Sequence, residues 1–137
     1  MKSFILLTCF CFFTIVVTAQ TTPYNVVFDL TSKDTADHKM VIRWINGITS
    51  TNPAAKLELV LYGQSVDMVV KDRSVVTDAL QQIRANKNVG ITVCAASLKR
   101  HQIDQGQLLP GINVVPDGIY QIVVRQQEGW GYIKVAH

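Results

Sequence analysis

The chain has 137 residues, of which 48% are hydrophobic, and its formal net charge is +3. This length suits one ordinary domain, and so small a net charge argues against nucleic acid or an anionic membrane surface as a partner. Three cysteines without a C-x-x-C pair exclude a cysteine-cluster metal site, and no motif predicts a cofactor.

Residues 1–19 have the pattern of a secretory signal peptide. Lys2 supplies a positive start, residues 4–17 form an apolar run, and small residues precede a cleavage position after Ala19. The apolar run is shorter than the roughly 20 residues that a membrane span needs, which favours a cleaved signal over an uncleaved anchor. We therefore expect an exported protein, periplasmic or secreted, with no membrane attachment after cleavage.

Cleavage would leave Cys94 as the single cysteine of residues 20–137, because Cys9 and Cys11 lie in the predicted signal. No intrachain disulfide could then form, even in an oxidising compartment. Cys94 is either an inert packing residue or a reactive thiol.

The first predicted elements are a strand, a helix and a second strand. Residues 24–30 are rich in β-branched and aromatic side chains, which is typical of a strand. Apolar residues recur at helical spacing over residues 36–49, and Pro53 follows, where no helix can continue. Residues 56–62 alternate and then run apolar, which predicts a strand closed by Gly63.

The second half continues this alternation. Residues 66–70 are predicted to form a short extra strand or a loop, and residues 74–86 a helix. Residues 89–93 form a short apolar strand that runs into a helix at residues 94–102. The chain then continues with a strand at residues 112–116, a helix at residues 117–127 and a last strand at residues 130–135.

Short apolar strands that alternate with amphipathic helices predict one α/β domain over residues 20–137, with a mainly parallel sheet. Ligands and chemistry gather at the carboxyl ends of the strands in such sheets. Cys94 falls at one of these ends, in the N-cap or first turn of a helix, where unpaired N–H groups lower the pKa of a thiol. Residues 62–65 follow another strand and could reach the same rim.

Three further side chains are accessory candidates, each with a simpler alternative. Asp29 ends the first strand and could line the rim near Cys94, or it could be a turn acid that caps backbone N–H groups. Ser97 lies near Cys94, where a hydroxyl on the helix surface is the simpler interpretation. His101 could carry a proton, or it could simply face solvent. No histidine or carboxylate has a spacing that demands a hydrolytic triad.

Three segments in order resemble a known family. They are V-C-A-A-S-L-K-R at residues 93–100, L-L-P-G-I-N-V-V-P-D-G at residues 108–118 and R-Q-Q-E-G-W-G-Y-I at residues 125–133. Together they resemble the DsrE/DsrF-like sulfur-relay family, in particular its exported branch, from about Tyr24 to Val135.

The resemblance implies a three-layer α/β/α sandwich with a five-stranded, mostly parallel sheet. It also implies homo-oligomers, often trimers or hexamers, and a cysteine that carries sulfur as a persulfide, a position that Cys94 matches. An exported protein would not meet the cytoplasmic partners of the relay proteins, so a role in transfer-RNA modification is not carried over. The sulfur donor and the acceptor thiol stay unidentified.

Three functions remain open at this point. The first is a sulfur carrier, or sulfurtransferase, that acts through Cys94. The second is a non-catalytic oligomeric binding module of the same fold, in which Cys94 is structural. The third is a redox sensor whose lone thiol forms an intermolecular disulfide. Separately, the Gln126–Tyr132 segment could be an oligomer contact, or a helix end broken by Gly129 with Trp130 and Tyr132 packed on an edge strand.

Overall fold

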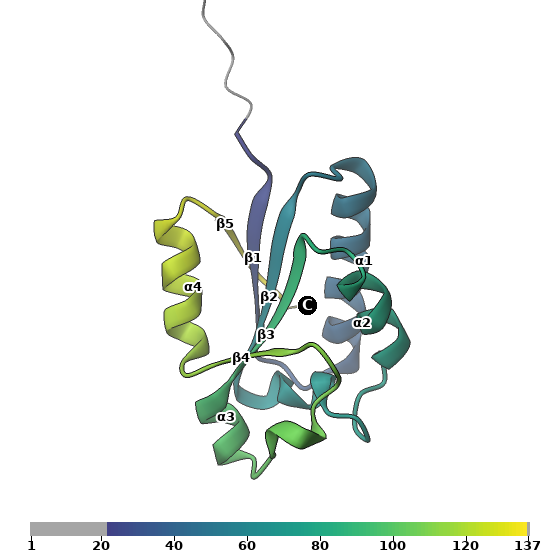
Figure 1. The fold of residues 1–137 in the computed structure, drawn as a ribbon, viewed down its shortest axis with the longest axis vertical. Coiled ribbons are helices and arrows are strands. Elements are labelled where there is room, and N and C mark those ends of the chain that lie inside the picture. The colour runs from purple at the N-terminus through teal and green to yellow at the C-terminus, as the bar shows by residue number, and fades with distance from the viewer. Residues whose placement is uncertain (1–21, 137) are drawn as a thin grey trace, which may run out of the picture.

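The computed structural model describes residues 22–136, so the predicted signal peptide with Cys9 and Cys11 lies outside the described residues. Helices and strands alternate as the sequence predicts (Figure 1). In chain order the elements are β1 (Asn25–Leu30), α1 (Thr35–Thr51), β2 (Lys56–Leu61), the 3₁₀ helix η1 (Gly63–Val69), α2 (Thr77–Arg84), β3 (Val89–Cys94), α3 (Ala95–Arg100), the 3₁₀ helix η2 (Gln105–Gln107), β4 (Asn113–Val115), α4 (Gly118–Gln127) and β5 (Gly131–Lys134). Among these residues, no helix combines the length and the apolar character needed to cross a membrane.

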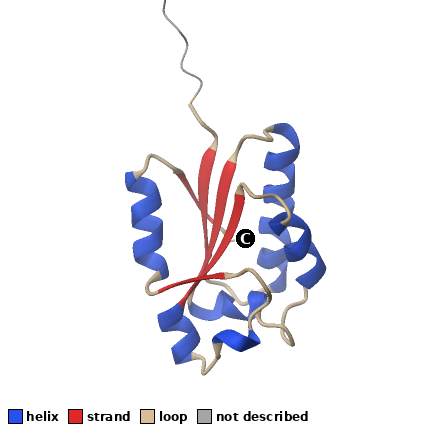
Figure 2. Cartoon of the chain, viewed as in Figure 1, coloured by secondary structure: helices blue, strands red, loops and turns tan. Residues whose placement is uncertain are grey.

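The five strands form one parallel sheet in the order β4-β3-β2-β1-β5. Figure 2 shows α1 and α2 on one face of the sheet and α4 on the other, with α3 below the carboxyl ends of the strands. The chain moves from β1 outward to β4 and then returns past β1 to β5, and this reversal carries α4 to the opposite face. The predicted three-layer α/β/α sandwich is confirmed, and all of its neighbouring strands are parallel.

The two faces of the sheet differ sharply in character. The large apolar core, which includes Phe28, Leu59 and Ile91, lies between the sheet and the layer of α1 and α2. A much smaller cluster on the α4 side contains Val27, Val60 and Ile122. Strand side chains alternate between the two faces of the sheet, so the buried polar side chains of the strands share the α4 side with these few apolar ones. These polar residues are Asp29, Glu58 and Thr92. The α4 face of the sheet is therefore the polar one.

Residues 66–70 form neither the extra strand nor the loop that the sequence predicts. Most of them belong to η1, with Val66, Met68 and Val69 buried in the large core. β2 is already paired on both edges, so a segment that follows it cannot pair with it, and Val70 forms only an isolated antiparallel bridge with Leu108. The Ser65 hydroxyl donates to the carbonyl oxygen of Leu30 at 2.6 Å, which ties η1 to the end of β1. The helix expected at residues 74–86 is also shorter, spanning Thr77–Arg84.

Candidate active site around Cys94

Cys94 is the last residue of β3 and the N-cap of α3, as the sequence predicts. Its extended backbone (φ −78°, ψ 119°) ends the strand, and the helix begins at the next residue. On the neighbouring strand Cys94 is in register with Val115, so the end of β4 and the start of α4 lie beside it. The residue is 5% exposed.

Burial and hydrogen bonding act in opposite directions on the pKa of the Cys94 thiol. Burial raises that pKa because it removes water from the thiolate. Backbone N–H groups of Gly118, Ser97 and Ala96, together with the Ser97 hydroxyl, favour the anion and outweigh burial, so the pKa is lower than that of an ordinary thiol. When protonated, the thiol faces the carbonyl oxygen of Pro116 at 3.9 Å.

The close approach of α4 to the sulfur depends on Gly118. A Cβ atom at this position would lie 3.1 Å from the Cβ of Cys94 and 3.3 Å from a methyl carbon of Val60. Both distances are tighter than ordinary van der Waals contacts. The missing side chain therefore lets the first N–H of α4 reach the Cys94 sulfur.

Cys94 borders a cavity of about 410 Å³ at the carboxyl edge of the sheet. The cavity is lined by residues from four stretches of the chain, namely Thr31, Tyr62, Gly63, Cys94, Ala96, Ser97, Arg100, Asp117 and Ile119. Arg100 and Asp117 are exposed and bring one positive and one negative charge to its border. Among the residues that the structure describes, no carboxylate forms an ion pair with Arg100. The cavity is therefore large enough to admit a small molecule beside the thiol, and the Arg100 guanidinium lies at its border.

Ser97 is buried, which corrects the interpretation of its side chain as a hydroxyl on the helix surface. Its Oγ accepts a hydrogen bond from the Gly63 N–H at 2.9 Å, and the hydroxyl lowers the pKa of the Cys94 thiol because it favours the thiolate. The sequence could not show this, because the Gly63 partner lies 34 residues away. The predicted approach of Tyr62 and Gly63 to the rim is confirmed.

Asp29 does not line the cavity, and it does not act as a turn cap. Its carboxylate accepts hydrogen bonds from the hydroxyls of Tyr132 at 2.6 Å and Tyr62 at 3.3 Å, and it pairs with Lys134 at 2.9 Å. Lys134 also donates to the Thr31 hydroxyl at 3.0 Å. Asp29 is therefore hydrogen-bonded to Tyr62, which lines the cavity. It is also linked to Thr31, another lining residue, because Lys134 contacts both Asp29 and Thr31.

This arrangement raises the pKa of both tyrosines. Burial raises the pKa of Tyr62 to about 12, with the charge and hydrogen bond of Asp29 acting in the same direction. For Tyr132 the hydrogen bond to Asp29 is the leading cause of a pKa of about 12, followed by burial. Both phenols are thus neutral at ordinary pH. Tyr62, which lines the cavity, therefore keeps its proton there.

His101 lies at the far end of α3 as its C-cap and does not line the cavity. Arg100, in contrast, reaches the cavity, although the sequence analysis did not consider it a site residue. A signal was present: Arg100 follows Ala96 and Ser97 by four and three residues, a spacing that places all three on one face of a helix. Within residues 22–136, no group of three histidine, cysteine or carboxylate side chains is placed to hold a metal ion.

Comparisons with known proteins agree with this architecture. A sequence model described as the DsrE/DsrF-like family matches residues 25–135. Protein MTH1491 of Methanobacterium thermoautotrophicum, whose structure is described as that of a protein of unknown function, shares 28% sequence identity with a TM-score of 0.76; the match covers 81% of this chain and 98% of that chain. No curated protein matches the chain in sequence.

Two more distant structures share the fold. Protein BT1422 of Bacteroides thetaiotaomicron is 15% identical with a TM-score of 0.66, over 82% of this chain and 95% of that one. The ychN protein of E. coli is 12% identical with a TM-score of 0.67, over 82% of this chain and 98% of that one.

Proposed function

Because this chain belongs to the DsrE/DsrF-like family and has a sulfur-relay type of fold, we propose that Cys94 carries sulfur as a persulfide. In the first step the Cys94 thiolate attacks the outer sulfur of a persulfide donor, R–S–SH. A bond forms between the Cys94 Sγ and the outer sulfur, and the bond between the two donor sulfurs breaks. The donor leaves as the thiolate R–S⁻ with the bonding electron pair, so no external oxidant or reductant is needed.

In the second step an acceptor thiolate attacks the outer sulfur of the Cys94 persulfide. A new persulfide forms on the acceptor, and Cys94 returns as a thiolate. The same N–H groups and hydroxyl that favour the thiolate before the first step would favour it as the leaving group in the second.

The observation that carries this proposal is the environment of the sulfur. The start of α4 at Gly118 packs directly against Cys94, the N–H groups of α3 and α4 lower the pKa of its thiol, and the same residue borders a cavity with room for an attached sulfur and part of a donor. A cysteine that served packing alone would need neither the donors nor the cavity.

Mass spectrometry of the intact protein tests the proposal. After incubation with a low-molecular-weight persulfide and removal of the excess, the protein should gain the mass of one sulfur atom, and the Cys94→Ser variant should gain none. Addition of an acceptor thiol should remove the added mass from the wild-type protein. An unchanged mass with every persulfide tried would reject the carrier function.

A non-catalytic oligomeric module with a structural cysteine is the second candidate, and the 5% exposure of Cys94 favours it. Alkylation of the folded protein separates the two functions. A carrier should react with iodoacetamide under native conditions, at a rate that rises as pH passes the lowered pKa. A structural thiol should react only at the rate of global unfolding.

Two properties of the whole protein belong to the same proposal. Ile119, Tyr120 and Val123 are 58%, 65% and 40% exposed on α4, and this apolar surface supports association with further copies of the chain, as a trimer or hexamer. Residues 1–19 support export, and N-terminal sequencing of the protein recovered outside the cytoplasm should begin at Gln20.

A further inference from the structure

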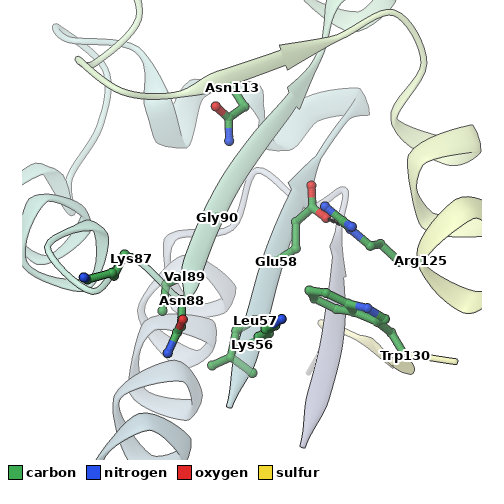
Figure 3. A pocket seen from close by; sticks show the side chains of 10 residues that line it. All are labelled: Lys56, Leu57, Glu58, Lys87, Asn88, Val89, Gly90, Asn113, Arg125 and Trp130. Carbon is green, nitrogen blue, oxygen red and sulfur yellow. Dashed lines mark hydrogen bonds and ion pairs between the residues drawn. The ribbon is translucent and has the colours of Figure 1, made fainter. Parts of the chain in front are cut away.

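We propose that a second cavity, on the α4 side of β2 and β3, binds a small organic anion that carries a carboxylate or a phosphate. The cavity has a volume of about 430 Å³ and shares no lining residue with the Cys94 cavity (Figure 3). Its floor lies at Gly90, four residues before Cys94 and therefore roughly 13 Å along the strand. The proposal does not depend on the chemistry of Cys94.

The floor of this cavity is open because Gly90 has no side chain. Gly90 is in register with Glu58 on β2 and lies in the interior of β3. A Cβ atom at Gly90 would lie 3.8 Å from the Cγ of Glu58, which is an ordinary contact, so the packing of the chain itself does not require glycine here. A glycine weakens a strand and often marks close approach by a ligand.

One wall of the cavity is a rigid set of side chains. The buried carboxylate of Glu58 accepts hydrogen bonds from Thr92 at 2.6 Å and Gln121 at 3.0 Å, and it pairs with Arg125. The Arg125 guanidinium lies 4.6 Å from the centre of the Trp130 ring. Figure 3 shows the Glu58–Arg125 pair and the indole on the same side of the floor. These contacts fix the wall before any ligand arrives.

The charges around the cavity favour an anion. Lys56, Lys87 and Arg125 are cationic, whereas Glu58 is the one carboxylate among the lining residues. The oxygens of Glu58 are occupied by its partners, and Arg125 uses Nε for Glu58 and Nη1 for Glu128, which leaves Nη2 for a ligand. Among the described ion pairs, none includes either lysine. The Lys87 side chain points away from Gly90 in Figure 3, so the positive charge available to a ligand near the floor comes from Lys56 and Arg125.

The polar and aromatic side chains that line the cavity indicate that the anion also carries an uncharged organic group. The side-chain amide of Asn113 points from β4 toward the floor (Figure 3), and no described side chain or backbone group bonds to it. The indole of Trp130 offers an apolar surface at the opposite side. A ligand could place its anionic group near Lys56 and its uncharged organic group between Asn113 and Trp130. It would then contact all three side chains at once.

Calorimetric titration with phenyl phosphate and with benzoate tests the proposal and separates the two anionic groups. We expect at least one of them to bind, with an affinity that falls as salt is added, while benzyl alcohol does not bind. Inorganic phosphate should bind about tenfold more weakly than the better organic probe, because it lacks the body that contacts Trp130. Equal binding of inorganic phosphate, or no binding of either organic anion, would overturn the proposal.

Variants locate the site. Gly90→Val should weaken binding by about tenfold or more, because its side chain occupies the floor, while valine suits a strand and leaves persulfide formation at Cys94 unchanged. Lys56→Gln should weaken binding by about threefold to fivefold, and Lys39→Gln on α1 should leave it unchanged. Cys94→Ser should bind as the wild-type protein does, so the failure of one proposal does not imply the failure of the other.

Two results with these variants would overturn the assignment. One is an affinity that Gly90→Val leaves unchanged in a protein that unfolds at the wild-type temperature. The other is a change of oligomeric state in Gly90→Val, seen by sedimentation velocity, which would show that the cavity receives another copy of the chain instead.

Discussion

Ser97 links the Cys94 thiol to the backbone of a distant segment. Its hydroxyl accepts a hydrogen bond from the Gly63 N–H and favours the Cys94 thiolate, so one side chain both lowers the pKa of the thiol and holds the start of η1 against α3. A hydroxyl can act as donor and acceptor at once, which no apolar residue of similar size can do. The reactivity of Cys94 and the position of the Tyr62–Gly63 turn therefore depend on the same atom.

The Ser97→Ala substitution should raise the pKa of the Cys94 thiol, because one of the groups that favour the thiolate is lost. A smaller fraction of thiolate would then be present at neutral pH, and alkylation there should be slower than in the wild-type protein. The half-buried Gly63 N–H would also lose its acceptor, which should cost about 1 kcal/mol of unfolding free energy. The rate of alkylation against pH measures the first effect, and Ser50→Ala on the exposed end of α1 is the control.

Asp29 connects the cavity wall to β5 through Tyr132 and Lys134. Because the pKa of Tyr62 and Tyr132 is about 12 in the folded chain and about 10 in the unfolded chain, these phenols stabilise the fold below pH 10. That contribution should be lost as pH rises from about 10 to about 12.

The Asp29→Asn substitution should lower the pKa of both tyrosines, because it removes the negative charge that opposes their ionisation. Spectrophotometric titration of phenolate would show the change as an earlier rise in absorbance. Tyr120→Phe in the same background removes an exposed tyrosine that does not contact Asp29 and serves as the control. Phenolate curves that coincide for the wild-type and Asp29→Asn proteins would contradict this account of the Asp29 network.

At the scale of elements, α4 is the helix on which both cavities depend. Of the helices in residues 22–136, only α4 covers this face of the sheet (Figure 1). Its first residue, Gly118, packs against Cys94, and Arg125 near its end forms part of the wall of the second cavity. The helix begins at a defined residue because the Asp117 carboxylate accepts from the N–H groups of Ile119 at 2.9 Å and Tyr120 at 3.3 Å. The Asp117 cap adds to the stability of α4, which packs on only a small apolar cluster.

The Asp117→Ala substitution should reduce the unfolding free energy by about 1 kcal/mol, because the two N–H groups lose their acceptor. Asp117→Asn should lose less, since asparagine is also a favourable N-cap residue. Urea denaturation of the three proteins measures the difference. Equal midpoints for the alanine and asparagine variants would show that capping does not contribute at this helix.

At the scale of the whole molecule, the two sides of the sheet have different tasks. The side of α1 and α2 holds most of the apolar core and provides stability, whereas the side of α4 holds the buried polar residues of the strands and the second cavity. The Cys94 cavity lies at the carboxyl edge of the sheet, beside the start of α4. The outward surface of α4 then carries exposed apolar side chains beside the Cys94 cavity, which Ile119 also lines. Association through this surface would bring a second chain close to the thiol.

Under the proposed association through α4, the Tyr120→Asp substitution should shift the protein toward monomers, because a charge on α4 would be buried without a partner in the interface. Sedimentation velocity measures the shift. Tyr24→Asp, at an exposed tyrosine that precedes β1, should leave the oligomer intact. Identical sedimentation of the wild-type and Tyr120→Asp proteins would exclude this surface of α4 as the interface.

Local sequence patterns were sufficient to predict the alternation of strands and helices, the α/β class and the position of Cys94 between β3 and α3. These features depend on residues that are close in the chain, and the carboxyl ends of parallel strands meet at one edge in any order. The arrival of Tyr62 and Gly63 at the same rim could be predicted for that reason.

Only the tertiary structure decided which groups act on the sulfur. Gly118 reaches Cys94 because β4 pairs with β3, and Ser97 is buried because η1 packs against α3. Asp29 faces phenols and an amine that β2 and β5 bring to it, although the sequence suggested a turn cap. Such contacts join residues that are distant in the chain, and they depend on strand order and on the face that each side chain occupies, which local periodicity does not determine.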